Sequence, residues 1–126
     1  AEPATAAPGG EAAACSADDA AAMALLGDGN AAGTFPKTVA QCGRRSWSLL
    51  RGFRPDRLAA CVRQRVGVSD GCAQCFVAAG EYASQHCRFA CLFRAWCSRS
   101  CLNCVEPASQ GAKQCAGAEV PAALAC

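Results

Sequence analysis

Cysteine constrains this chain more than any other residue type. Twelve of the 126 residues are cysteine, about a tenth of a short sequence, and that proportion is typical of a disulfide scaffold in an oxidising compartment. Aromatic residues are few, so the core would be thin, and six bridges at about 2–4 kcal/mol each would compensate for it. We therefore expect disulfides at all twelve positions: Cys15, Cys42, Cys61, Cys72, Cys75, Cys87, Cys91, Cys97, Cys101, Cys104, Cys115 and Cys126.

The densest stretch is CRFACLFRAWCSRSCLNC, residues 87–104, which holds five cysteines. On one helix these five would fall within an arc of about 140°. Upstream, Ser69 can cap a helix on which Cys72, Cys75, Phe76 and Ala79 share one face. We predict an antiparallel helical hairpin of residues 70–85 and 88–104 that turns near residue 87.

Facing residues in such a hairpin have a nearly constant summed number, which predicts Cys72–Cys104 and Cys75–Cys101. The turn cysteines Cys87, Cys91 and Cys97 would then reach Cys15, Cys42 and Cys61, leaving Cys115 for Cys126. The full connectivity does not follow from sequence, because twelve cysteines allow about ten thousand pairings by the counting that gives 105 for eight.

The remaining sequence also favours an all-α fold. We expect an extended or flexible tail over residues 1–14 and one stapled domain over residues 15–126. Ser16 and Asp19 form a capping-box pattern for a helix that stops at Gly27, and a second helix runs from Pro55 to a stop at Gly67. The segment from Lys37 to Phe53 reads as short helical turns broken near Gly43, and the chain beyond Val105 reads as a loop tied back through Cys126.

Three chemical alternatives compete with a purely structural role. Two Cys-x-x-Cys pairs could bind zinc, but 25 residues separate them, more than usual. The CAQC motif suits a thioredoxin-like centre only after a strand, and none is predicted there. His86, the one histidine, adjoins Cys87 rather than facing it from another element. We expect no catalytic residue, metal or cofactor.

Charge is sorted along the chain although the net charge is only +2. The first thirty residues carry five acids and no base, whereas residues 44–65 carry seven arginines against Asp56 alone, which suits either an internal match or a docking surface. Nucleic acid is an unfavoured partner for a disulfide-rich chain of near-neutral charge. Acidic protein surfaces or anionic lipid headgroups fit better. Leu49 and Leu50 suit the core more than Trp47 does, so the predicted docking residues are Arg44, Arg45, Trp47, Arg51, Phe53 and Arg54.

The compartment follows from the same features. The sequence contains no apolar run long enough to span a bilayer. Its start, AEPATAAPGG, resembles what remains when an export signal is cut after a small residue. We expect an oxidising compartment outside the cytoplasm.

The stretch CAQCFVAAGEYASQHCRFACLFRAWCSRSCLNC, with FPKTVAQCGRRSWSLLRGF and CVRQRVGVSDGC before it, resembles small cysteine-rich proteins of dinoflagellate algae over roughly residues 15–105. The resemblance implies a cysteine framework without an assigned activity. It further implies the thylakoid lumen of the chloroplast and a peripheral subunit of photosystem I that holds core and antenna subunits together.

A second resemblance is to twin-cysteine helical hairpins of the mitochondrial intermembrane space. Their nine-residue spacing occurs between Cys87 and Cys97 and between Cys91 and Cys101, but on one predicted helix rather than two. The functional prediction is a non-catalytic structural or adaptor subunit that docks on a photosynthetic membrane complex. A secreted binding module and a thiol-disulfide oxidoreductase are the alternatives.

Overall fold

The fold is all-α, as the sequence predicts, apart from one very short β-hairpin. A computed structural model describes residues 13–126, so the predicted tail over residues 1–14 lies almost wholly outside the described residues. In this part of the chain the elements are α1 (Ala17–Leu26), α2 (Phe35–Arg45), β1 (Trp47–Ser48), β2 (Gly52–Phe53), α3 (Pro55–Val66), α4 (Asp70–His86), the π-helical turn η2 (Arg88–Leu92) and α5 (Arg99–Ala116).

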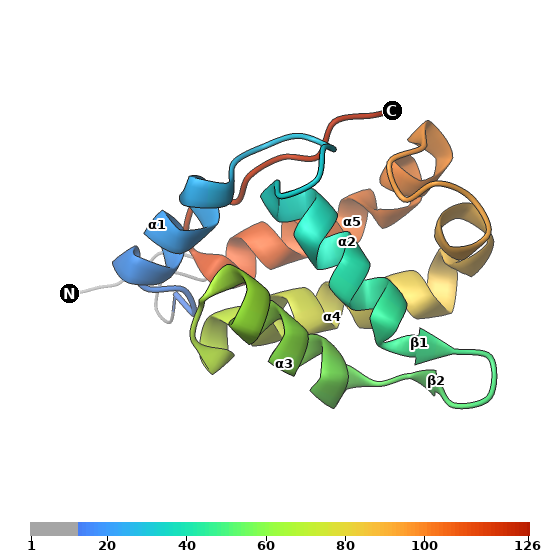
Figure 1. The fold of residues 1–126 in the computed structure, drawn as a ribbon, viewed down its shortest axis with the longest axis horizontal. Helices are drawn as coiled ribbons and strands as arrows, with labels where there is room; N and C mark the ends of the chain where they lie inside the picture. The colour runs from blue at the N-terminus through green and yellow to red at the C-terminus, as the bar shows by residue number, and fades with distance from the viewer. Residues whose placement is uncertain (1–12) are drawn as a thin grey trace.

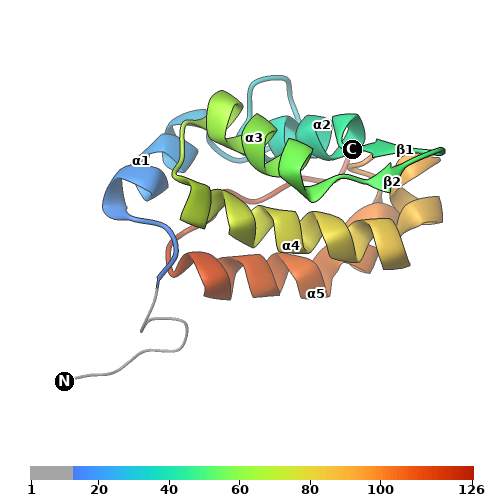
Figure 2. The ribbon, with the colours of Figure 1, turned by 90° about the horizontal axis from the view of Figure 1, so that it is seen from below.

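The helices are arranged around α4 (Figures 1 and 2). Helix α5 runs antiparallel to α4 along one side, and α3 and α2 cover the opposite side. Helix α1 lies at one end of the molecule, while β1, β2 and η2 lie at the other. The two-stranded sheet pairs Trp47 with Phe53 and Ser48 with Gly52.

The predicted helix boundaries that rest on capping residues are confirmed. Ser16 and Asp19 form the capping box of α1, and the Ser69 hydroxyl accepts the Cys72 N–H at the start of α4. Gly67 ends α3 in the left-handed conformation, with φ at 86°, which glycine adopts without steric cost. Local side-chain chemistry therefore fixes these ends.

The second arm of the predicted hairpin is shifted along the chain. It is α5, Arg99–Ala116, and not residues 88–104, because η2 and the following loop make the reversal. The predicted loop beyond Val105 is wrong for the same reason: α5 continues through Pro107. An interior proline costs a helix about 3 kcal/mol, and the packing of α5 along α4 with its bridges offsets this cost.

The predicted disulfides Cys72–Cys104 and Cys75–Cys101 are wrong. The hairpin is stapled instead by Cys75–Cys115, Cys87–Cys104 and Cys91–Cys101, with sequence separations of 40, 17 and 10. These bridges are nested, so the principle of a constant summed number holds for an antiparallel hairpin that reverses near residue 95. The error came from placing that reversal near residue 87.

The other three bridges attach the remaining segments to this hairpin and to one another. Cys15–Cys72 holds the start of α1 on α4, Cys42–Cys61 joins α2 to α3, and Cys97–Cys126 ties back the chain end. Cys87, Cys91 and Cys97 do not bond to Cys15, Cys42 or Cys61, and Cys115 does not bond to Cys126, so these predictions are wrong. The prediction that all twelve cysteines pair is confirmed.

Cysteines also make up much of the buried core. The largest side chains with essentially no exposure include Met23, Leu58 and Val62 together with Cys42, Cys72, Cys75 and Cys87. Phe35 of α2 meets Phe76 of α4 edge to face, with ring centroids 5.2 Å apart. Sulfur therefore replaces part of the hydrocarbon that a larger core would use.

The segment over residues 34–53 departs from its prediction in two respects. Helix α2 runs unbroken through Gly43, and β1 and β2 follow it where short helical turns were expected. The hairpin bends at Gly52, whose φ of 70° suits glycine. The Arg54 N–H donates to the Ser46 carbonyl at a distance of 2.7 Å, and this hydrogen bond closes the base of the β-hairpin.

Both ends of the described chain are attached to the fold. The Ala14 and Cys15 N–H groups donate to the carbonyls of Cys115 and Ala116, so residue 14 does not belong to a free tail. After α5 the chain runs back beside the α1–α2 loop as an extended strap, residues 118–126 (Figure 1). The Gly29 N–H donates to the Ala122 carbonyl, and the Ala122 N–H donates to the Asp28 carboxylate.

Asp19 connects the starts of two helices. Its buried carboxylate accepts the Ser16 N–H of its own cap and also the N–H and hydroxyl of Ser69, the cap of α4, at 2.9 and 2.7 Å. Burial alone would raise the pKa of Asp19, but the hydrogen bonds from Ser16 and Ser69 stabilise the charged form, and the pKa lies below its usual value of 3.8.

Replacing Asp19 by Asn should lower the free energy of unfolding at pH 7 by about 2–3 kcal/mol, because hydrogen bonds to a charged group are lost. A depressed native pKa stabilises the fold above the unfolded pKa, and this contribution disappears as pH falls through the native pKa. The deficit of D19N should therefore shrink in acid.

Guanidinium unfolding of the oxidised protein at pH 7 and in strong acid would measure both effects. The control is Asp18→Asn, since Asp18 is exposed in the same first turn of α1. Equal losses in the two variants would contradict the role assigned to Asp19.

Candidate docking surface and adjoining apolar cavity

Two solvent-exposed leucines lie at the tip of the β-hairpin. Leu49 is 83% exposed and Leu50 is 97% exposed, and they lie between the two strands of one turn. The sequence interpretation that placed these leucines in the core is therefore wrong. Aliphatic side chains this exposed gain free energy when another surface covers them.

The predicted docking arginines surround the base of this tip. Three of the four, Arg45, Arg51 and Arg54, line a polar hollow of about 300 Å³ together with Arg57, Ser46, Trp47 and Ser48. The fourth, Arg44, lines the neighbouring apolar cavity instead. Within residues 13–126, the ion pairs of the arginine-rich stretch are Arg54 with Asp56 at 3.9 Å and Arg63 with Asp70 at 2.6 Å. Two of the described acids of the first thirty residues make other contacts: Asp19 and Asp28 accept hydrogen bonds from Ser69 and Ala122.

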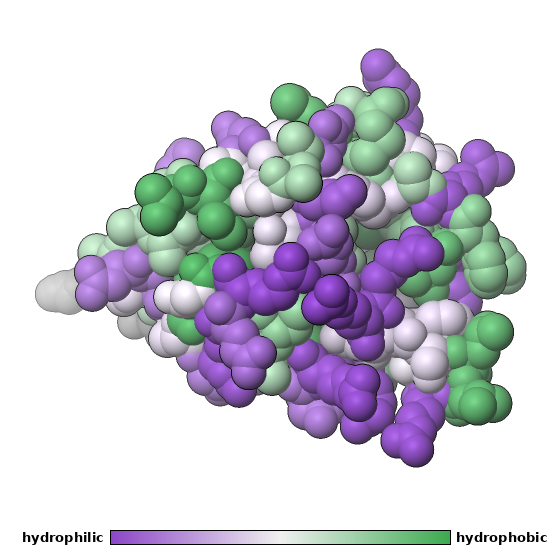
Figure 3. All heavy atoms as spheres, viewed as in Figure 1, coloured by the Kyte–Doolittle hydropathy of each residue, from purple (hydrophilic) through white to green (hydrophobic). Residues whose placement is uncertain are grey.

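A second exposed apolar pair lies on and beside η2. Phe89 and Phe93 are 78% and 61% exposed, and their rings stack with centroids 5.6 Å apart. The guanidinium of Arg88 lies 5.7 Å from the centre of the Trp47 ring, which places η2 against the hairpin. Figure 3 shows hydrophobic and hydrophilic side chains mixed at this end of the molecule.

Three of the six predicted docking residues, Trp47, Phe53 and Arg54, are partly buried. Arg44, Arg45 and Arg51 are exposed. The Phe53 ring packs over Gly80 of α4: a Cβ at position 80 would lie 3.2 Å from Phe53 Cζ and 2.5 Å from Leu58 Cδ2. Phe53 therefore anchors the hairpin to α4.

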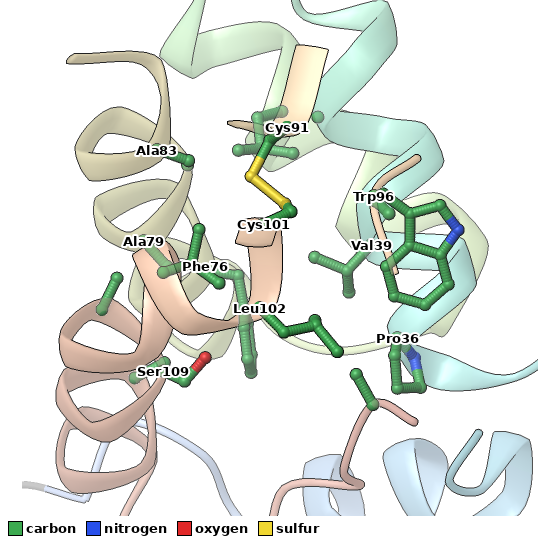
Figure 4. A pocket seen from close by; sticks show the side chains of 18 of the residues that line it. Pro36, Val39, Phe76, Ala79, Ala83, Cys91, Trp96, Cys101, Leu102 and Ser109 are labelled. Carbon is green, nitrogen blue, oxygen red and sulfur yellow. A yellow bond between two sulfur atoms is a disulfide. The ribbon is translucent and has the colours of Figure 1, made fainter. Parts of the chain in front are cut away.

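A second hollow, largely apolar, opens between α2 on one side and α4 and α5 on the other. Its volume is about 380 Å³, within the range of small-molecule sites. Figure 4 shows Pro36 and Val39 facing Ala79 and Ala83 across it. Its lining also includes Phe35, Trp47, Phe76, Trp96, Leu102, Val105, Ala108, Ala112 and Val120.

Small residues and staples keep this apolar cavity open. Ala79, Gly80 and Ala83 on α4 and Ala108 and Ala112 on α5 leave space that larger side chains would fill. Bridges from Cys42 to Cys61 and from Cys91 to Cys101 hold α2 and the first turn of α5 in place. The sequence interpretation missed the cavity, because only Ala79 and Ala83 fell on a predicted helix, whereas Ala108 and Ala112 fell in the segment expected to be a loop.

The strap forms one wall of the cavity. Val120, Pro121, Ala122 and Ala123 all line it. The strap ends at the Cys97–Cys126 bridge, where the Cys126 N–H also donates to the Cys97 carbonyl. A covalent bond therefore limits how far this wall can open.

Trp47 lines both hollows, the apolar one and the basic one. Arg44, in the last turn of α2, also lines the apolar cavity at this end. The molecule thus places an apolar slot directly beside a cluster of arginines.

The cysteine positions considered for other chemistry have structural partners. Cys72 and Cys75 bond to Cys15 and Cys115 and not to each other, so the CAQC motif does not form a redox disulfide here. The other two sulfurs considered for zinc, those of Cys101 and Cys104, are bonded to Cys91 and Cys87. Cys15, Asp19 and Cys72 do cluster, but the two sulfurs are bonded together. His86 is exposed and lies against Tyr82, with ring centroids 4.6 Å apart.

Gly80→Ala should lower the free energy of unfolding by about 1–3 kcal/mol, because the added methyl group would displace Leu58 or Phe53. The matched control is Gly111→Ala on α5, where an added Cβ meets nothing within 4 Å. That change should stabilise the protein by up to about 1 kcal/mol. Guanidinium unfolding would measure both, and effects of the same sign and size would contradict the packing described.

No helix among residues 13–126 has the length and apolar character needed to cross a bilayer. Comparison of the chain with protein-family models, with curated proteins and with solved structures finds no match.

Proposed function

We propose that this protein is a non-catalytic docking subunit that binds the acidic face of a membrane-associated protein complex in an oxidising compartment. The observation that carries the proposal is the bare hairpin tip, Leu49 and Leu50, with exposed arginines at its base. Apolar anchors beside arginine are the usual centre of a protein–protein interface.

The shape of the basic surface favours a protein partner over a flat lipid surface. The arginines line a concave hollow, which suits a protruding side chain better than a plane of headgroups. Guanidinium groups match the geometry of carboxylates, so aspartate and glutamate are the groups expected to enter it.

Rigidity supports the same role. Cys42–Cys61 fixes α2 to α3, the two helices that flank the hairpin, and Phe53 packs on α4. A surface that is already ordered loses little conformational entropy on binding, so a small patch can bind stably.

The resemblance to dinoflagellate cysteine-rich proteins supports a more specific partner. In that setting the complex is photosystem I with its antenna, and the compartment is the thylakoid lumen. The six disulfides are compatible with a lumen or with secretion, so the choice between them depends on the resemblance.

Replacing Leu49 and Leu50 together by Ser should weaken binding to the complex by more than about tenfold, since burial of each leucine contributes about 1.5–3 kcal/mol. The control is Leu25→Ser, because Leu25 is 86% exposed on α1 at the opposite end. Arg45→Glu with Arg51→Glu should weaken binding as well.

The measurement is comigration of added tagged protein with detergent-solubilised photosynthetic complexes, alongside sedimentation with vesicles containing phosphatidylglycerol. The proposal predicts comigration that the L49S/L50S pair abolishes and L25S retains, with weaker vesicle binding. Absence of comigration, or vesicle binding of equal strength, would overturn it.

A further inference from the structure

We infer that the apolar cavity between α2, α4 and α5 binds one single-chain amphiphile with an anionic headgroup, such as a fatty acid. This inference is independent of the docking proposal, because it concerns the cavity and not the hairpin tip. It rests on the size of the cavity, the chemistry of its lining and the charges at its two ends.

The size of the cavity suits one alkyl chain. A methylene group is close in size to a water molecule, whose share of liquid volume is about 30 Å³. The cavity of about 380 Å³ therefore holds roughly twelve carbons. It is lined along α5 from Cys101 to Lys113, about 18 Å at the helical rise, so it is elongated like such a chain.

The lining is mostly carbon and contains few hydrogen-bonding groups. Alanines, Val39, Leu102 and aromatic rings supply most of it, with Ser84 and Ser109 as the hydroxyls. A polar ligand would leave its own groups without partners in such a cavity, at a cost in free energy. An alkyl chain has no hydrogen bonds to lose there, and its apolar surface is removed from water.

Charge distinguishes the two ends and places the headgroup. Arg44 lies at the end near Trp47, and Trp47 also lines the basic hollow with its arginines. Lys113 lines the opposite end, and the strap residue Ala122, which also lines the cavity, donates its N–H to the Asp28 carboxylate. Glu106, another lining residue, accepts a hydrogen bond from Gln110. The positive end is therefore the Arg44 end.

The strap controls entry. It contributes four residues to the cavity wall and is tied down by Cys97–Cys126 and by hydrogen bonds to the α1–α2 loop. An amphiphile must pass this segment or the Arg44 end to enter. Loss of the bridge should therefore speed exchange more than it changes affinity.

The test is titration of the oxidised full chain with tetradecanoate below its micellar concentration. Trp47 and Trp96, the two tryptophans of the chain, both line the cavity, so intrinsic fluorescence reports binding without a label. Native mass spectrometry would give the stoichiometry, expected to be one. Affinity should rise up to about fourfold per methylene from octanoate onward and then level off as the cavity fills.

Matched variants distinguish binding in the cavity from adsorption on the surface. Ala79→Phe fills the cavity and should weaken binding at least about tenfold, whereas Ala78→Phe, on the exposed face of α4, should leave it unchanged. Arg44→Gln should weaken the binding of tetradecanoate but not of tetradecanol, and Lys113→Gln should change the binding of neither. Cys97→Ser with Cys126→Ser should raise the dissociation rate.

Saturable 1:1 binding with this pattern supports the inference. A folded wild-type protein that binds no tetradecanoate, equal binding by A79F and A78F, or equal affinity for the acid and the alcohol would overturn it. A doubled native mass in place of the complex would assign the cavity to a second copy of the chain and would also overturn it. These results do not depend on the hairpin-tip variants: if L49S/L50S left docking unaffected, the docking proposal would fail while the amphiphile inference would still be tested by the binding measurements.

Discussion

The covalent pairing of α4 with α5 is the constraint on which the rest of this structure depends. Three nested bridges join α5 to α4, to the residue that caps α4 and to η2, and so hold the two helices in one antiparallel register: Cys75–Cys115, Cys87–Cys104 and Cys91–Cys101. A proline interrupts the hydrogen-bond ladder of α5, so helix propensity alone would not keep this arm intact. The bridges instead reduce the conformational entropy of the unfolded chain, so stability depends less on filling a hydrocarbon core.

That arrangement explains two features that an ordinary small domain would avoid. The first is a cavity walled by alanines, which loses packing contacts in a core that is already short of large side chains. The second is a hairpin tip with two fully presented leucines. Cross-links let the fold tolerate both, because neither the cavity nor the tip has to contribute to folding.

The features that the sequence predicts correctly depend on short-range interactions, and those it misses depend on long-range ones. Ser16, Asp19, Ser69 and Gly67 act on backbone groups within a few residues, and the helix ends they predict are correct. The hairpin partner was right in kind but wrong in position, because the five cysteines of residues 87–104 also fit one helical arc, and no local signal marked η2 as the reversal. The pairing of Cys75 with Cys115 depends on that register, so one error in the turn changed every bridge of the hairpin. The exposure of Leu50 and the space beside Ala79 depend on how whole helices pack, and no local pattern determines that.

The disulfide map of the oxidised protein tests the central claim most directly. Chymotrypsin, which cleaves after Phe76 and Leu102, together with trypsin separates the relevant cysteines for mass spectrometry of unreduced peptides. The structure predicts that the peptide carrying Cys72 and Cys75 is linked to the peptides of Cys15 and Cys115, with Cys104 linked to Cys87. Links from Cys72 and Cys75 to the peptides of Cys104 and Cys101, or any free thiol, would contradict the account.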